Sequence, residues 1–138
     1  MVPEQPELSE LTEQQIDALS NSLGQRFAEV REEIHQELLQ SDEESYLDLA
    51  GRVRDSEDES VANLLVDLKF AAMDRHVLEI RAIEAALARI REGSYGICSD
   101  CADPVGFERQ QAYPTAKRCY RCQTVYEKTH YQESHPRL

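Results

Sequence analysis

Residues 95–122 read YGICSDCADPVGFERQQAYPTAKRCYRC, and this stretch decides the fold. It holds two Cys-x-x-Cys pairs, Cys98 with Cys101 and Cys119 with Cys122, separated by seventeen residues. Two such loops supply four thiolates at ~2.3 Å from one ion, the tetrahedral set that structural zinc sites use. With all four positions taken by sulfur, no open position remains for catalysis. The spacing therefore predicts one structural Zn²⁺ per chain, bound by these four cysteines.

The segment around the cysteines is poor in apolar side chains. Only a minimal core is expected for residues 95–123, formed by Tyr95, Ile97, Val105, Phe107 and Tyr113. Zinc is therefore expected to contribute folding free energy to this module. Two disulfides would need an oxidising compartment, and a redox-active pair would stand alone near a βαβ pattern. Neither alternative fits the sequence as well as a metal site does.

Two apolar stripes with helical spacing precede the cysteines. Thr12 and Gln15 form a capping-box pattern at the start of the first, with Leu11 and Ile16 as a hydrophobic staple. Neither stripe is stable alone in water, so we expect the two helices to pack as an antiparallel hairpin. His76 lies on the second stripe and is interpreted as a packed core histidine. The first stripe comprises Ile16, Leu19, Leu23, Phe27, Val30, Ile34 and Leu38; the second comprises Val61, Leu65, Leu68, Ala72, His76, Ile80, Ile83, Leu87 and Ile90.

The connection between the helices is ambiguous. Residues 40–56 either continue the first helix or leave it at Gly51, and Ser56 with Glu59 offers a second capping box for a helix reaching Arg91. We expect a mainly α protein: a disordered lead at 1–10, a helical hairpin at 11–93 with its tip near 50–60, and a zinc-finger module with a C-terminal helix at 94–138.

Charge is distributed unevenly along the chain. The formal net charge is −12, and residues 1–60 hold 17 acidic but only 4 basic side chains. An acidic arm is repelled by nucleic-acid phosphates and attracted to basic protein surfaces. No stretch approaches the ~20 apolar residues of a membrane span, and the polar N-terminus is no signal peptide. The sequence thus predicts a cytoplasmic protein without membrane contact.

A helical hairpin that runs into YGICSDC, followed by Pro114-Thr115-Ala116 and a second Cys-x-x-Cys, resembles the bacterial DksA/TraR family. The resemblance covers roughly residues 11–130 and is densest over 80–122. It implies a transcription regulator, not an enzyme, whose zinc module anchors on RNA polymerase. The hairpin would enter the secondary channel of the polymerase, without sequence-specific DNA binding. The family's Asp-x-x-Asp-x-Ala tip motif falls on Asp55, Asp58 and Ser60, so serine replaces the alanine.

The resemblance also bears on guanosine tetraphosphate, the alarmone that often acts with this family. Arg75 matches one basic contact of the family, whereas Ala82 and Gln123 stand where others have lysine. Each lost charge-assisted contact removes on the order of 1.5–3 kcal/mol. We therefore expect a weak or absent alarmone response at this surface.

Two other functions remain open from the sequence. The cysteine spacing is shared with GATA-like DNA-binding zinc fingers, although residues 96–138 carry a net charge of only +1 (6 basic and 5 acidic). A coiled-coil adaptor is the second alternative, in which the stripes bind another protein or pair between two copies of the chain. An enzyme is disfavoured, because no nucleophile–base pair or phosphate-binding loop is present.

Overall fold

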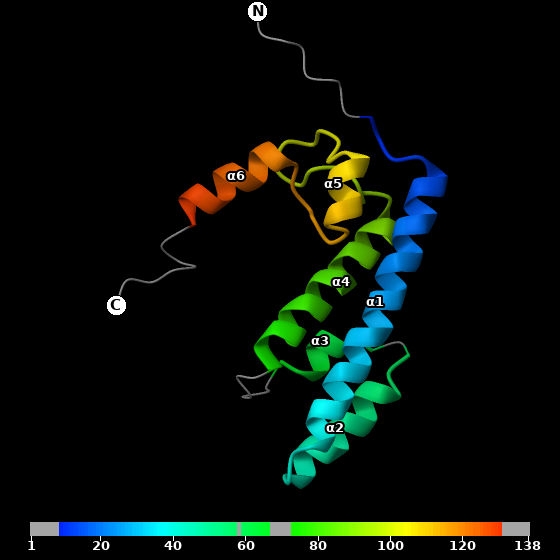
Figure 1. Ribbon diagram of the computed structural model, residues 1–138, viewed down its shortest axis with the longest axis vertical. Coiled ribbons are helices and arrows are strands. Elements are labelled where there is room, and N and C mark those ends of the chain that lie inside the picture. The colour runs from blue at the N-terminus through cyan, green and yellow to red at the C-terminus, as the bar shows by residue number, and fades with distance from the viewer. Residues whose placement is uncertain (1–8, 58, 67–72, 131–138) are drawn as a thin grey trace, which may run out of the picture.

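A computed structural model describes residues 9–57, 59–66 and 73–130. It shows a slender helical arm with a small cysteine-bearing module at one end (Figure 1). The helices are α1 (Glu13–Leu39), α2 (Glu44–Arg54), α3 (Val61–Leu64), α4 (Asp74–Glu92), α5 (Phe107–Ala112) and α6 (Tyr120–Thr129). Within the described ranges, the only β pairing is an isolated antiparallel bridge between Ile97 and Pro104. The predicted mainly α class is confirmed.

The long helix α1 forms as the sequence predicts. The Thr12 hydroxyl accepts the amide of Gln15 at 3.1 Å, and the Gln15 side chain accepts the amide of Thr12 at 3.0 Å. This reciprocal capping box satisfies two amides that a helix start leaves free. Most of the predicted stripe is buried, and Ile16 and Phe27 pack at its edge; the buried members are Leu19, Leu23, Val30, Ile34 and Leu38.

Two different helices cover successive parts of α1. Helix α4 packs on the part nearer the cysteine module, and α2 packs on the part beyond it (Figure 1). The Arg26 guanidinium donates to both carboxylate oxygens of Glu79 at 2.5 and 3.0 Å, which joins α1 to α4. His76 lies partly buried in the same seam, with Nε2 3.1 Å from Glu33 and Nδ1 3.1 Å from Glu37. It packs within the arm, as expected, between two carboxylates.

The arm turns back earlier than the sequence suggested. Helix α1 ends at Leu39, and the Ser41 hydroxyl accepts the amide of Glu43 at 3.1 Å in the turn that follows. Serine side chains that bond the local backbone in this way compete with helix continuation. Gly51 does not end a helix but lies inside α2, whose Ala50 and Val53 are buried against α1. The reversal therefore lies at residues 40–43, and the expected tip near 50–60 is corrected.

The second arm of the hairpin is divided rather than continuous. The Ser56 hydroxyl donates back to the Val53 carbonyl at 2.8 Å, and no helix begins at the residue after it, so the expected capping box with Glu59 does not form. Ser60 caps α3 instead, by accepting the Asn63 amide at 3.1 Å. The expected helix from 57 to 91 is thus replaced by the short α3 and by α4. Leu68 and Ala72 of the predicted stripe lie outside the described residues.

Helix α4 delivers the chain to the cysteine module. Gly93 ends it in the left-handed conformation (φ 79°), which is the glycine stop expected there. Leu11 packs over the following turn at Gly96, so the start of α1 also touches the module. Residues 1–8 of the expected disordered lead lie outside the described part of the chain. Among the described helices, each is too short or too polar to cross a bilayer.

Candidate metal centre

The first cysteine pair lies on a tight loop directly after α4. The amide of Cys98 donates to the carbonyl of Asp103 at 2.8 Å, and the amide of Ala102 donates to the carbonyl of Cys98 at 3.0 Å. Ala102 has a left-handed backbone with φ 65°. These bonds curl residues 98–103 so that the Asp100 amide lies 3.4 Å from the Cys98 sulfur. The loop thereby aims thiol groups and amide donors at one point.

The second pair opens helix α6. Cys119 is its N-cap residue, and its sulfur accepts the backbone amide of Cys122 at 3.4 Å. A backbone bond from Ser99 to the Lys117 carbonyl, 2.9 Å long, joins the two loops. The pairs are therefore fixed relative to each other by the backbone.

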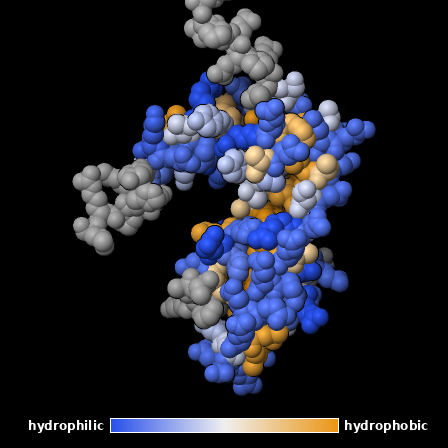
Figure 2. Space-filling model, viewed as in Figure 1, coloured by the Kyte–Doolittle hydropathy of each residue, from blue (hydrophilic) through white to orange (hydrophobic). Residues whose placement is uncertain are grey.

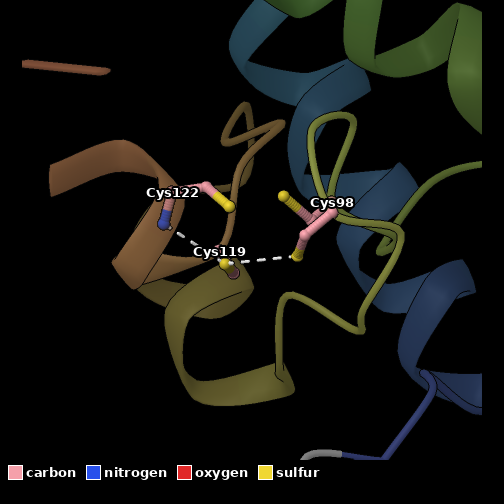
Figure 3. A group of neighbouring side chains, drawn as sticks. Cys98, Cys119 and Cys122 are labelled. Atoms are coloured by element: carbon pink, nitrogen blue, oxygen red, sulfur yellow. Dashed lines mark hydrogen bonds between the residues drawn. The ribbon is translucent and has the colours of Figure 1, made fainter. Parts of the chain in front are cut away.

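The four sulfur atoms converge on one point. All lie within 4.8 Å of one another, and the sulfurs of Cys101 and Cys119 are 3.8 Å apart. Figure 3 shows the side chains of Cys98, Cys119 and Cys122 pointing toward a common centre. Tetrahedral zinc with bonds of ~2.3 Å requires sulfur–sulfur distances of about 3.8 Å. Because Cys98 and Cys119 are also buried, the donor set fits a structural zinc ion in size, chemistry and shielding.

The pKa values of the thiols also indicate a metal site. Burial opposes ionisation of Cys98, but the surrounding backbone amides outweigh burial and lower the pKa of this thiol to about 6. Contact with the Cys119 sulfur raises the pKa of Cys122 to about 12. Thiolates this close repel one another, so all four are ionised together only around a cation. A divalent metal with sulfur affinity supplies that charge.

Residues 113–116, called the strap here, lead from α5 toward the second cysteine pair. A buried glutamine on α5 contacts the backbone of this strap. Gln110 is fully buried, and its Nε2 group lies 3.2, 3.4 and 2.9 Å from the carbonyl oxygens of Tyr113, Pro114 and Ala116. The Tyr95 hydroxyl donates to the Pro114 carbonyl at 2.8 Å, and burial raises the pKa of Tyr95 to about 12. The phenol therefore stays a donor at neutral pH. The strap that leads to the second cysteine pair is thus tied to the end of α4.

None of the residues of helix α6 is buried, so α6 is held mainly by polar contacts, among them an ion pair between Arg121 and Asp103 at 3.7 Å. The Arg118 guanidinium donates to Asp100 at 2.8 Å and lies 3.8 Å from the centre of the Tyr126 ring. This combination of an ion pair and a cation–π contact links α6 to the first cysteine loop. Helix α6 is therefore linked to the first cysteine loop through Arg118 as well as through the cysteines.

The structure separates the predicted tip residues from the end of the arm. Asp55 caps the C-terminus of α2, Ser60 caps the N-terminus of α3, and Asp58 lies outside the described residues. Arg31 of α1 donates to the carbonyl of Ser56 at 3.3 Å. Arg31 precedes the end of α1 by eight residues, so this segment lies roughly 12 Å short of the reversal. It borders a shallow depression lined by Asp48, Gly51, Arg52, Asp55, Ser56, Glu57 and Glu59.

Sequence reasoning missed the residues that support the metal centre. Gln110, Arg118 and Arg89, which donates to the Thr115 carbonyl at 3.2 Å, carry no motif. The side chains of Gln110 and Arg89 donate to backbone carbonyls of the strap, Arg118 donates to the Asp100 carboxylate, and no spacing rule predicts such contacts. Tyr113 was expected in the module's core but is 62% exposed, so that assignment is wrong. Gln110 donates to the backbone carbonyl of Tyr113, while the Tyr113 ring is exposed.

The molecule thus belongs to the class of helical-arm proteins that carry a four-cysteine metal module. Residues 93–128 match the family described as prokaryotic dksA/traR C4-type zinc finger. The RNA polymerase-binding transcription factor DksA of Caulobacter vibrioides is 33% identical over 90 residues, which are 65% of this chain and 58% of the relative. Its namesake from Escherichia coli K12 is 30% identical over 80 residues, 58% of this chain and 53% of the relative.

A solved structure agrees with these relatives. Transcription factor DksA2 from Pseudomonas aeruginosa superposes with a TM-score of 0.57 at 25% identity, covering 86% of this chain and 88% of that one. This chain is therefore similar to DksA proteins in sequence and to DksA2 in fold, in agreement with the resemblance noted in the sequence. The matches span between half and three-fifths of the length of the two curated relatives. Both relatives are named as transcription factors rather than enzymes, in agreement with the non-enzymatic role expected here.

Proposed function

We propose that this chain is a zinc-containing transcription regulator that binds bacterial RNA polymerase in the cytoplasm. The observation that carries the proposal is the position of the four-sulfur module at one end of an acidic two-helix arm. The similarity to RNA polymerase-binding transcription factors supports it. A metal module with no open ligand position suits anchoring and not catalysis.

Cys98, Cys101, Cys119 and Cys122 hold one structural zinc ion per chain. The convergence of their sulfurs and the amide donors around Cys98 support this assignment. When bound, the ion supplies the positive charge that keeps four thiolates together. The apolar support inside the module is thin: Cys98, Val105 and Cys119 form its buried cluster, with Cys101 and Cys122 packed against it. Zinc binding is therefore coupled to folding of residues 94–129.

The arm inserts into the secondary channel of the polymerase. Its shape supports this proposal, because α1 alone extends roughly 40 Å and, among the described helices, α2 and α4 cover successive parts of it. Its acidity supports entry into a basic channel, with a salt-sensitive association rate. Asp55, Asp58 and Ser60 contact the polymerase, Asp55 and Ser60 from the flank of the arm. Asp55 lies on the surface depression beside α2, where its carboxylate is accessible.

In vitro transcription with purified polymerase tests the proposal. Wild type is compared with Asp55→Asn/Asp58→Asn, and Glu13→Gln/Asp17→Asn, at exposed positions of α1, serves as the control that removes the same number of charges. We expect wild type and control to bind and to change transcript output, and the double variant to bind without changing it. If wild type neither binds polymerase nor alters output, the proposed function fails. If the double variant regulates normally, only the role of the flank residues fails.

Guanosine tetraphosphate has little effect at this surface. Arg75 is exposed on α4, where its guanidinium is accessible to an anion. Ala82 carries no charge, and the side-chain amide of Gln123 already donates to Glu127 at 3.1 Å. Calorimetric titration of the polymerase complex with guanosine tetraphosphate measures this directly. Binding at the family's usual strength would contradict the proposal.

A further inference from the structure

The far end of the arm is formed by the turn between α1 and α2. In Figure 1 this turn lies at the end opposite the cysteine module, while Leu11 at the start of α1 touches the module at Gly96. The 27 residues of α1 separate the two ends by roughly 40 Å. Residues 39–48 are therefore the first part of the arm to contact a partner that the arm enters.

Two leucines are exposed at this end. Leu39, the last residue of α1, is 44% exposed, and Leu47 in the first turn of α2 is 41% exposed. Leu38 and Ala50, which are close to them in the sequence, are buried. Leu39 and Leu47 are thus not part of the apolar core at this end of the arm. Figure 2 shows hydrophobic atoms gathered at this end of an otherwise mainly hydrophilic lower arm. An apolar pair at the far end of a thin arm is positioned for contact with a partner.

Four exposed acidic residues lie close to the two leucines in the sequence. They are Asp42, Glu43, Glu44 and Asp48. Residues 32–51 hold seven acidic side chains and no Lys or Arg. Phosphate-rich partners, whether nucleic acid or anionic membrane, are repelled by such a field. The charge pattern selects a basic protein surface that has an apolar recess at its centre.

We propose that Leu39 and Leu47, with the acidic residues close to them in the sequence, form a contact surface for a basic, apolar-centred site on the polymerase. This inference rests on the proposed function and deepens it, because it names the part of the arm that makes the innermost contact. It is distinct from Asp55 and Ser60, which belong to the segment roughly 12 Å back along the arm. The leucines contribute apolar burial, and the acidic residues contribute attraction and orientation.

The test measures binding of the full-length, zinc-loaded protein to purified core polymerase. The key variant is Leu39→Gln/Leu47→Gln, which replaces exposed side chains only. Leu78→Gln is the matched control, since Leu78 is 63% exposed on α4 and lies away from the far end. We expect the double variant to bind at least ten-fold more weakly and the control to bind as wild type does. A second variant, Asp42→Lys/Glu43→Lys, should slow association and reduce its dependence on salt.

The outcomes separate this inference from the proposed function. If wild type binds and both far-end variants bind equally well, the inference is overturned while the proposed function stands. If wild type does not bind polymerase at all, both are overturned. Light scattering of the same samples measures whether the two leucines instead bind a second copy of the chain. A wild-type dimer that becomes monomeric in Leu39→Gln/Leu47→Gln would make a second copy the occupant and would also overturn the inference.

Discussion

The Nδ1 atom of His35 on α1 lies 2.8 Å from the carbonyl oxygen of Ala50 on α2. Since a carbonyl oxygen only accepts, Nδ1 carries the proton. The contact is buried and lies where α2 folds back along α1. It therefore ties the reversed segment, whose position differs from the sequence-based expectation, to the long helix.

We expect His35→Ala to loosen α2 selectively. The loss of one buried hydrogen bond and of the imidazole's packing should cost about 1–3 kcal/mol. Hydrogen exchange should show faster exchange in residues 44–54, while residues 74–92 keep their protection. Gln25→Ala, at an exposed position of the same helix, is the control and should leave both segments unchanged. Uniform loss of protection along the whole arm would contradict a local role.

Gln110 offers a prediction about the metal centre. Gln110→Leu keeps the side chain's bulk but removes the donor to three strap carbonyls, and this should lower the free energy of unfolding by about 1–3 kcal/mol. Because the strap leads to Cys119, zinc should also transfer faster to a competing chelator. Gln111→Leu is a neighbouring exposed control that should change neither quantity. Equal zinc release from both variants would show that the strap does not hold the site.

The turn at Gly96 should not tolerate a side chain. Its φ of 87° strains any L residue, and an added Cβ would lie 2.8 Å from the Leu11 side chain. We expect Gly96→Ala to destabilise the protein by about 1–3 kcal/mol in thermal unfolding. Adding Leu11→Ala should relieve the contact but not the backbone strain.

Gly51 is the opposite case, because it lies inside α2 and a Cβ added there would meet nothing within 4 Å. There, Gly51→Ala should stabilise the protein by about 0.5–1 kcal/mol. If Gly51→Ala destabilised the chain as Gly96→Ala does, the helical assignment of residues 44–54 would be refuted.

The ion pair between Arg26 and Glu79 predicts a pH dependence. The hydrogen bond from Arg26 holds the pKa of Glu79 below its usual value. A carboxyl group whose folded pKa is lowered stabilises the fold above its unfolded pKa, and this contribution is lost as pH falls through the folded pKa. The difference in unfolding free energy between wild type and Glu79→Gln should thus be present at pH 7 and shrink below about pH 4.5. Glu92→Gln, at an exposed position, is the control. A difference that stayed constant to about pH 3 would contradict this account.

The sequence predicted what depends on local pattern. The Thr12 capping box, the α1 stripe and the helix end at Gly93 each depend on particular residue types at fixed spacings, and all three are present. The convergence of four sulfurs followed from the two Cys-x-x-Cys pairs. Each of these features involves a short segment whose geometry one or two residue types determine.

What the sequence did not predict depends on competition between distant segments. The apolar residues of 46–53 fit a longer first helix as well as a separate one, and only packing of Ala50 and Val53 on α1 selects the reversal at 40–43. Ser56 and Ser60 are both residue types that fit an N-cap, and the helix begins after Ser60, which accepts the Asn63 amide. The supports from Gln110 and Arg118 are tertiary contacts to backbone and charge that no periodicity encodes.

Site-specific photocrosslinking tests the central claim most directly. A photoreactive p-benzoylphenylalanine replaces Ser45, which is exposed at the far end of the arm, and in a second sample it replaces Gln111 on the cysteine module. After irradiation of the polymerase complex, the crosslinked peptides are mapped by mass spectrometry. We expect the Ser45 position to label residues that line the secondary channel and the Gln111 position to label its rim. Labelling of the outer polymerase surface from the Ser45 position, or none from either position, would contradict the account.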